Sequence, residues 1–330
     1  METIMTRSST SSSNLKSVFR FLKRTLVFAF AFVLAMILAL LLTGWGCQSG
    51  RLGTAYKKHA RLEALSSPKM VLVGGSNLHY GINSKMLQDS IDIPVVNMGI
   101  QQSIGLQYMF DEVKESLREG DILMVLIEPS SYIGMPIEGQ TNIARIASIY
   151  PKGIRHLNAK QWYNVAMYSG MALIQNFRDM QVALSKKLRG KPTFYESCDE
   201  FGDYHGHKGK ASQFKSRYRD FTDDKFHDNG ILPLIDHIQK YVEQKNARVL
   251  IGFTPSAKSM SDSLFFGKIQ MKLPPEIVVG NISDYILPDA FFFDSPNHLI
   301  YSKRDMRTQM LIQDLREYKA TNDLHLKGNY

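Results

Sequence analysis

Residues 69 to 77 read KMVLVGGSN, a short apolar run that ends in two glycines, a serine and an asparagine. The run has the length and the β-branched content of a buried strand, and the glycines predict a tight turn at its end. Three further runs of this kind follow along the chain: 93–97 (IPVVN), 122–127 (ILMVLI) and 248–253 (RVLIGF). Continuous apolar strands are typical of a parallel sheet that is covered on both faces.

Amphipathic helices are expected between and after these strands. Apolar residues recur at helical spacing in 104–117, 231–244 and 302–320, and Ser302 is placed as the N-cap of the last helix. Strands that alternate with helices predict an α/β fold, here a three-layer α/β/α sandwich with a mostly parallel sheet. Such a sandwich accounts for one domain of ordinary size.

The middle of the chain, 142 to 226, departs from this alternation. Residues 144–149 and 161–188 have helical periodicity, whereas 189–215 is rich in Gly, His, Lys and Asp and is expected to be a loop. We interpret this part as a helical insertion or cap over the sheet, and not as a second domain.

An unbroken apolar run, TLVFAFAFVLAMILALLL, occupies residues 25 to 42. As a helix it is about 27 Å long, close to the roughly 30 Å of a bilayer's hydrocarbon core. Trp45 follows at the position of an interfacial aromatic residue, and four cations precede the run: Lys16, Arg20, Lys23 and Arg24. The positive-inside rule then keeps the N-terminus in the cytoplasm. The sequence therefore predicts a single-pass signal anchor in the cytoplasmic membrane.

This anchor divides the chain into four parts: a cytoplasmic tail (1–24), the transmembrane anchor (25–45), a polar, helix-prone part that is a stalk or a first helix (46–68) and an extracytoplasmic domain (69–330). Two other interpretations stay open, which are cleavage of the segment as a signal peptide and lipidation at Cys47. The chain has two cysteines, Cys47 and Cys198. Two unpaired thiols and a bridge between them are both compatible with the sequence.

The formal net charge is +9, but lysine and arginine are spread along the chain rather than gathered into one stripe. We therefore expect no nucleic-acid partner and favour proximity to an anionic membrane or glycan. No cysteine pair or His/Cys cluster has the spacing of metal ligands, and His205 and His207 are expected in a solvated loop. No metal and no cofactor are expected.

Three short motifs stand where ligands bind in an open α/β sheet, after strands or before the last helix. Ser76 follows the first exported strand and Gly99 follows the second, while Asp294 and His298 share one loop before the last helix. A serine on a glycine turn can expose its hydroxyl, a glycine N–H can face the cleft, and an acid can orient a histidine base. Each motif alone is also common as an ordinary turn. Two further side chains are candidates for the cleft: His79 and Glu128, where Glu128 is equally compatible with bonding a turn.

Together these motifs resemble the SGNH hydrolase family, which has a flavodoxin-like α/β sandwich. The resemblance makes Ser76 the nucleophile and Asp294 and His298 the rest of its triad. It also makes the N–H groups of Ser76 and Gly99 the donors of an oxyanion hole. Two features depart from the family: no Asn follows the third strand as in its G-x-N-D block, and the final Asp and His are one residue further apart than in DxxH. The third oxyanion donor is therefore unassigned, with Asn77 as one candidate.

One branch of that family is similar in more features. These are an N-terminal anchor, a G-G-S-N turn, a G-D-I strand followed by Glu-Pro, and a D-x-x-x-H-L ending. The branch includes the proteins that esterify teichoic acid with D-alanine and the O-acetyltransferases of alginate and cellulose systems. The resemblance implies serine-dependent acyl transfer on a cell-envelope or exported polysaccharide, through an acyl-Ser76 intermediate. It also implies a polymer acceptor and a multi-spanning membrane acyltransferase as partners.

Two alternatives stay open from the sequence alone. The departures from the family pattern are compatible with a non-catalytic scaffold or glycan-binding protein that has kept the fold. The triad is equally compatible with a general secreted esterase, because transfer and hydrolysis use the same groups.

Overall fold

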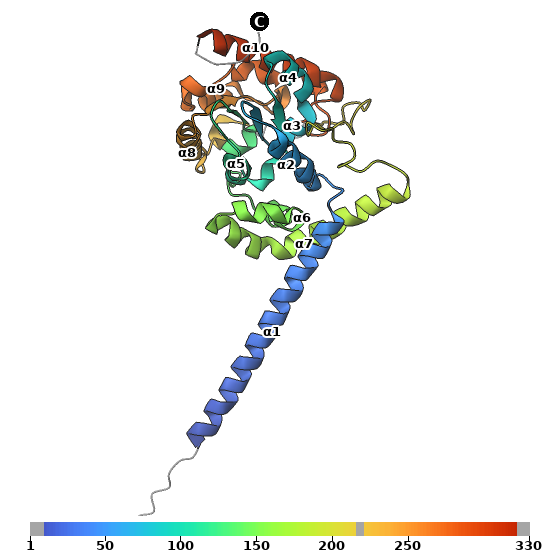
Figure 1. Ribbon diagram of the computed structural model, residues 1–330, viewed down its shortest axis with the longest axis vertical. Coiled ribbons are helices and arrows are strands. Elements are labelled where there is room, and N and C mark those ends of the chain that lie inside the picture. Colours follow the sequence, from blue (N-terminus) through green and yellow to red (C-terminus); the bar gives the residue numbers. More distant parts are fainter. Residues whose placement is uncertain (1–9, 216–220, 322–330) are drawn as a thin grey trace, which may run out of the picture.

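The computed structural model describes residues 10–215 and 221–321, and its centre is a four-stranded parallel sheet (Figure 1). The strand order is β2-β1-β3-β4. The strands have these bounds: β1 Met70–Gly74, β2 Val95–Asn97, β3 Ile122–Leu126 and β4 Arg248–Gly252. Every residue of β1, β2 and β3 is buried. The parallel sheet predicted from the four apolar runs is confirmed.

Hydrogen bonds between neighbouring strands set the register of the sheet. Val71 of β1 pairs with Val96 of β2 and with Leu123 of β3, and Leu123 in turn pairs with Val249 of β4. Because the strands are parallel, the residues that follow β1 and β3 lie side by side at the carboxyl ends of the strands. The chain changes direction across the sheet between these two strands, and open α/β sheets bind ligands at such a switch point.

Helices cover both faces of the sheet. The covering helices are α4 (Ser84–Ile91) and α10 (Arg304–Thr321) on one face, and α5 (Leu106–Lys114) and α8 (Ile231–Gln244) on the other. Alternate side chains of a strand point to opposite faces, so Met70 and Leu72 pack in the core with α4 and α10. Val71 and Val73 pack in the core with α5 and α8. The predicted α/β class is therefore confirmed.

Shorter elements complete the domain. They are α3 (Ser76–Gly81), α9 (Ser263–Lys272) and a two-stranded parallel sheet of β5 (Ser256–Ala257) and β6 (Ile286–Leu287). The prediction that Ser302 caps the last helix is wrong. The N–H of Lys303 donates to the carbonyl of Ile300 at 3.0 Å, which winds a 3-10 turn over Tyr301–Lys303 before α10 begins at Arg304.

α1 (Thr10–Gly46) is one continuous helix that projects from the domain (Figure 1). Among the described residues, its stretch Leu15–Gly46 is the one helix long and apolar enough to cross a membrane. Residues 10–24, which we expected in the cytoplasmic tail, continue the same helix. The first part of that tail, 1–9, lies outside the described residues.

Of the two alternatives for the segment after α1, a stalk or a first helix, the structure has a helix that packs into the domain. η1 (Leu52–Thr54) and α2 (Ala55–Ala64) follow the anchor, and both have buried faces. Leu52, Lys58 and Leu62 are at most 3% exposed. Lys58 donates to two backbone carbonyl groups at 2.7 Å each, so even the charge on this polar helix points inward.

Most of the insertion forms a helical platform between α1 and the sheet domain (Figure 1). The platform consists of α6 (Thr141–Ile149), η4 (Pro151–His156) and α7 (Ala159–Leu188). α6 and α7 pack against each other and against α1. These helices therefore lie where α1 joins the domain. The loop after α7 returns to β2, where the N–H of Asn97 donates to the carbonyl of Phe201 at 3.1 Å.

Candidate active site

Ser76 begins α3 directly after β1, so it stands at the edge of the sheet where β1 and β3 end. It is 7% exposed. Gly75 before it leaves no room for a side chain: a Cβ there would lie 2.3 Å from Oε1 of Glu128 and 2.8 Å from Oε1 of Gln102. Close packing behind this glycine fixes the position of the serine.

The loop before α10 carries Asp294 and His298 to Ser76 across a sequence separation of 222 residues. Nε2 of His298 lies 2.7 Å from Oγ of Ser76. Nδ1 of the same ring lies 2.7 Å from Oδ1 of Asp294. The structure thus brings together the three residues that the sequence singles out as a triad.

The charge of Asp294 fixes the position of the proton on the histidine. Burial raises the pKa of this carboxyl, but the hydrogen bond and charge of His298, with the charge of Arg51, outweigh burial, so its pKa lies below the usual value. An ionised carboxylate only accepts hydrogen bonds. Neutral His298 therefore donates from Nδ1 and keeps the Nε2 lone pair for the serine proton. This arrangement can perform nucleophilic catalysis with a serine, a base and an orienting acid.

The imidazole of His298 is also held on one face. The ring of Tyr80 stacks on it, with centroids 4.2 Å apart and planes inclined by 11°. The Tyr80 hydroxyl accepts a hydrogen bond from Nη2 of Arg51 at 3.1 Å. Proximity to Ser76 in the chain was the only sequence signal for Tyr80, and Arg51 had none.

Further hydrogen bonds tie the loop of Asp294 and His298 to the domain. The N–H of Phe293 donates to the carbonyl of His298 at 2.7 Å, which closes the loop at its base. Nδ2 of Asn297 donates to the carbonyl of Pro255 at 2.9 Å. The closed loop brings the Asp and His side chains together despite the spacing of four residues.

The predicted oxyanion donors are only partly free. The N–H of Ser76 donates to no residue among those described. The N–H of Gly99 donates to Oδ1 of Asn97 at 3.0 Å, and Nδ2 of Asn77 donates to Oε1 of Glu128 at 3.1 Å. A role for Gly99 or Asn77 in binding an oxyanion stays a prediction that requires these hydrogen bonds to break.

Glu128, which follows β3, forms hydrogen bonds with the turn that carries Ser76 and Asn77. Its Oε1 accepts from both the backbone N–H and the side-chain amide of Asn77, each at 3.1 Å. It is 7% exposed. Of the two interpretations of Glu128, facing the cleft or bonding a turn, the contacts favour the second.

His79, the other cleft candidate, is completely buried beside Cys198. Its Nε2 lies 3.2 Å from the Cys198 sulfur. Burial lowers the pKa of His79 well below its usual value and raises the pKa of Cys198 to about 12, so both groups are neutral near pH 7. The two side chains pack under the loop that follows α7 and do not line an open cleft. Cys198 and Cys47 are both free thiols.

The loop with His205 and His207 was expected to be solvated, but His207 is buried and His205 is half-buried, while residues 208–213 are exposed. His207 is fully buried and lies against Tyr80, with ring centroids 5.1 Å apart, and burial lowers its pKa to about 4. Nε2 of His205 lies 2.8 Å from Oδ2 of Asp199. The described residues contain no group of three or more His, Cys, Asp or Glu side chains that could hold a metal ion.

Gln102 is a site residue that the sequence did not single out. Its side chain is buried beside Gly75, with Nε2 bonded to the Ser131 hydroxyl and Oε1 without a partner. Rotating the amide by 180° lets Ser131 donate to the oxygen and turns the NH₂ group towards Gly75. Gln102 is therefore a buried amide beside Gly75 that in this orientation has an N–H without a partner among the described residues.

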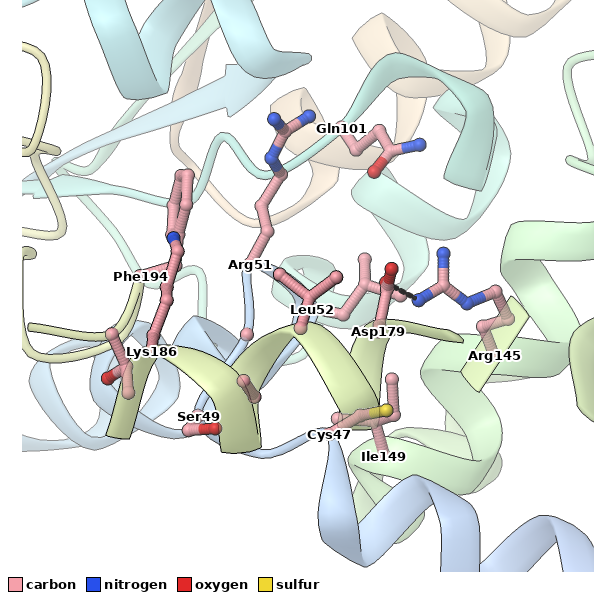
Figure 2. A pocket seen from close by; sticks show the side chains of 14 residues that line it. Cys47, Ser49, Arg51, Leu52, Gln101, Arg145, Ile149, Asp179, Lys186 and Phe194 are labelled. Carbon is pink, nitrogen blue, oxygen red and sulfur yellow. Dashed lines mark hydrogen bonds and ion pairs between the residues drawn. The ribbon is translucent and has the colours of Figure 1, made fainter. Parts of the chain in front are cut away.

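A cavity of about 390 Å³ lies between the end of α1, the platform and the loop that carries Phe194 (Figure 2). Three cations and one acid line it: Arg51, Arg145, Lys186 and Asp179. Figure 2 shows Asp179 bonded to Arg145, while the guanidinium of Arg51 stands apart from them. Arg51 contacts Tyr80, which stacks on His298. The cavity suits an anionic group close to the candidate triad.

No family model, no curated protein and no solved structure matches the chain. Its chemistry therefore follows from the site itself. The two hydrogen bonds of His298 and the cationic cavity that Arg51 lines are its strongest features.

Proposed function

We propose that this chain is a membrane-anchored, extracytoplasmic acyl-transfer enzyme of the SGNH type, with a three-layer sandwich and Ser76 as its nucleophile. The observation that carries the proposal is the pair of 2.7 Å hydrogen bonds that join Ser76, His298 and Asp294. A buried serine with this pairing is the arrangement that activates a hydroxyl for acyl transfer.

The proposed reaction has two steps. In the first, Nε2 of His298 takes the Ser76 proton while Oγ attacks the carbonyl carbon of an ester. The tetrahedral intermediate collapses, the bond to the leaving alcohol breaks, and His298 returns the proton to that alcohol. In the second step an acceptor hydroxyl loses its proton to His298 and attacks the acyl-Ser76 carbonyl. The bond to Ser76 Oγ then breaks, and His298 returns the proton to that oxygen. Asp294 stabilises the imidazolium in both steps.

The oxyanion needs donors in both steps. The free N–H of Ser76 is one, and the loss of a single donor typically raises the barrier by about 3–4 kcal/mol. The amide of Gln102 is the second in this proposal, because it is buried beside Gly75 and has an unused polar atom. The Gly99 N–H becomes a third if the intermediate displaces the Asn97 side chain.

The substrate in this proposal is a polymer of the cell envelope or an exported polysaccharide. α1 keeps the enzyme at the membrane where such polymers are made, and it favours acyl supply by a multi-spanning membrane acyltransferase. The cationic cavity beside Arg51 favours a substrate that carries a phosphate or carboxylate near the acylated hydroxyl.

Fluorophosphonate labelling of the full-length protein in detergent micelles tests the proposed nucleophile. Intact-mass analysis is expected to find one adduct, which maps to Ser76 and is absent from Ser76→Ala. Ser66→Ala, a matched change at an exposed serine, is expected to label like the wild type. No adduct on folded protein, or an adduct that persists in Ser76→Ala, counts against the triad.

A non-catalytic scaffold is the second candidate function. The engaged N–H of Gly99 and the engaged amide of Asn77 favour it, because they leave an incomplete oxyanion hole. Exposure to p-nitrophenyl acetate separates the candidates. An acetylated Ser76 supports the enzyme, whereas a folded, unlabelled protein that still binds polymer supports the scaffold.

A further inference from the structure

We infer that α7 lies in the plane of the membrane, with its outward face immersed in the outer leaflet of the bilayer that α1 crosses. The inference rests on the proposed anchoring of α1. It adds a second membrane contact that would hold the candidate active site at a fixed height above the lipid.

The first observation is that α7 is apolar on the outside over residues 161–177, whereas exposed charged side chains follow in its second half, among them Arg178 and Lys187. Its exposed face carries large apolar side chains at intervals of mostly three and four residues: Trp162, Tyr163, Met167, Met171, Ile174, Phe177, Leu184 and Leu188. Tyr163 and Met167 are more than 60% exposed, and Leu188 is 79% exposed. Its fully buried positions are Gln161, Ala172 and Asn176. A surface helix of a soluble domain shows the opposite pattern.

The second observation is that the polar side of α7 cannot turn outward. Oδ1 of Asn176 accepts from Nε of Arg145 at 2.9 Å, and Nδ2 donates to the hydroxyl of Ser148 at 3.0 Å. The backbone carbonyl of Asn176 accepts from the Cys47 thiol at 2.9 Å. Since these bonds are buried, rolling the helix would leave polar groups unpaired. The apolar face is therefore fixed in its outward direction.

The third observation is the level at which α7 meets α1. Ala172 packs against Leu40 in one small core, to which Met36 also contributes. Met36 and Leu40 lie inside the apolar run that ends at Leu42, with Met36 about 9 Å below that end at 1.5 Å per residue. If α1 crosses the bilayer, the middle of α7 is at the depth of the outer leaflet's upper hydrocarbon. This matches the roughly 5–10 Å immersion of interfacial helices.

The composition of α7 fits that depth. Residues 161 to 177 contain no charged side chain, and Lys160 and Arg178 bound the stretch on either side. Trp162 and Tyr163 are residue types enriched at the membrane surface. A cavity of about 970 Å³ beside the end of α1 continues this surface and is lined by Trp45, Phe177, Leu184 and two lysines among others. Apolar side chains with cations at the rim suit lipid chains below anionic headgroups.

The two tryptophans of the chain, Trp45 and Trp162, make the inference testable one position at a time. Trp45→Phe leaves Trp162 as the reporter for α7, and Trp162→Phe leaves Trp45 as the reporter for α1. Each full-length variant is placed in nanodiscs of phosphatidylcholine and phosphatidylglycerol. Its fluorescence is then quenched with acrylamide from water, or with phosphatidylcholine brominated near the headgroup end of its acyl chains.

Brominated lipid is expected to quench Trp162, and its acrylamide quenching constant is expected to fall at least about threefold from that of a water-exposed tryptophan. Free access of acrylamide without lipid quenching would overturn the inference. Shielding from both quenchers would also overturn it, in favour of a protein partner or second copy on this face. If lipid quenches Trp45 but not Trp162, the proposed anchoring of α1 is supported and only the membrane contact of α7 is rejected. If neither is quenched by lipid, the proposed anchoring fails as well.

Discussion

At the scale of single residues, the hydrogen bond between Asp294 and His298 links the candidate chemistry to stability. The folded protein holds the pKa of Asp294 below its usual value, although burial opposes this, because His298 bonds its charged form. A carboxyl with a depressed pKa adds stability above the unfolded value near 4, and this stability is lost as the pH falls through the folded value. The contribution is therefore full at neutral pH and absent in strong acid.

Asp294→Asn is expected to remove that contribution. The melting temperature of the variant should lie below that of the wild type at neutral pH, and the gap should narrow as the pH falls from about 6 to about 3. Fluorophosphonate labelling of Ser76 should slow by up to about 10⁴-fold, because the amide stabilises the wrong histidine tautomer. Asp236→Asn on the surface of α8 is the control, and a gap that stays constant with pH would contradict the account.

Gln102→Ala is expected to lower the turnover of a p-nitrophenyl ester by about 10²-fold with little change in KM, because an oxyanion donor acts in the transition state. Gln107→Ala, a half-exposed glutamine in α5, is the control. Equal kcat in the wild type and Gln102→Ala would remove Gln102 from the oxyanion hole. A change confined to KM would assign it to substrate binding instead.

The sequence predicted the three residues of the triad but not the residues that support them. The candidate triad lies beside the ends of strands and helices, where short motifs can be recognised in the sequence: Ser76, Asp294 and His298. The contacts of Gln102 and Arg51 are with segments that are distant in the chain. The residues next to them in the sequence form no motif that would indicate these contacts.

At the scale of elements, the apolar strands were predictable and the orientation of α7 was not. The four strands and α8 match their predicted positions within two residues. The strands were predictable because a strand that is buried on both faces has a continuous apolar sequence. The period of α7 was visible too. Its apolar side points away from the core, so a pattern that gives only the spacing could not tell which face is buried.

Asn176 is the residue on which the packing of α7 depends most directly. Asn176→Ala removes the partner of both Arg145 and Ser148 in a fully buried place. The free energy of unfolding should fall by about 1–3 kcal/mol, the cost of leaving a buried polar group unpaired. Thermal unfolding of the full-length protein in detergent measures this, with Gln175→Ala at the half-exposed neighbouring position as control. Equal melting temperatures would mean that water replaces the lost bonds.

At the scale of the whole molecule, the proposed anchoring makes α1 and the platform the parts that determine the position of the candidate site relative to the membrane. α1 runs without interruption into residues that are buried in the domain, so the anchor and the domain are joined without a flexible stalk. From the sequence, the chain from Leu52 to Leu62 was compatible with a stalk or a first helix. Its polar composition did not show how deeply it packs, because the side chains that point inward include a charged one, Lys58.

If α1 crosses a membrane, its orientation decides on which side Ser76 lies. Four cations precede the apolar run, so the positive-inside rule predicts a cytoplasmic N-terminus and an exported domain. A C-terminal alkaline phosphatase fusion in a bacterial host should then be active, since this enzyme requires its exported disulfides. Exchanging Lys16, Arg20, Lys23 and Arg24 for glutamate should lower that activity, because it removes the charge bias without altering the apolar run. An inactive fusion of the unaltered chain, with a fluorescent C-terminal reporter in the cytoplasm, would reverse the orientation and exclude envelope polymers as substrates.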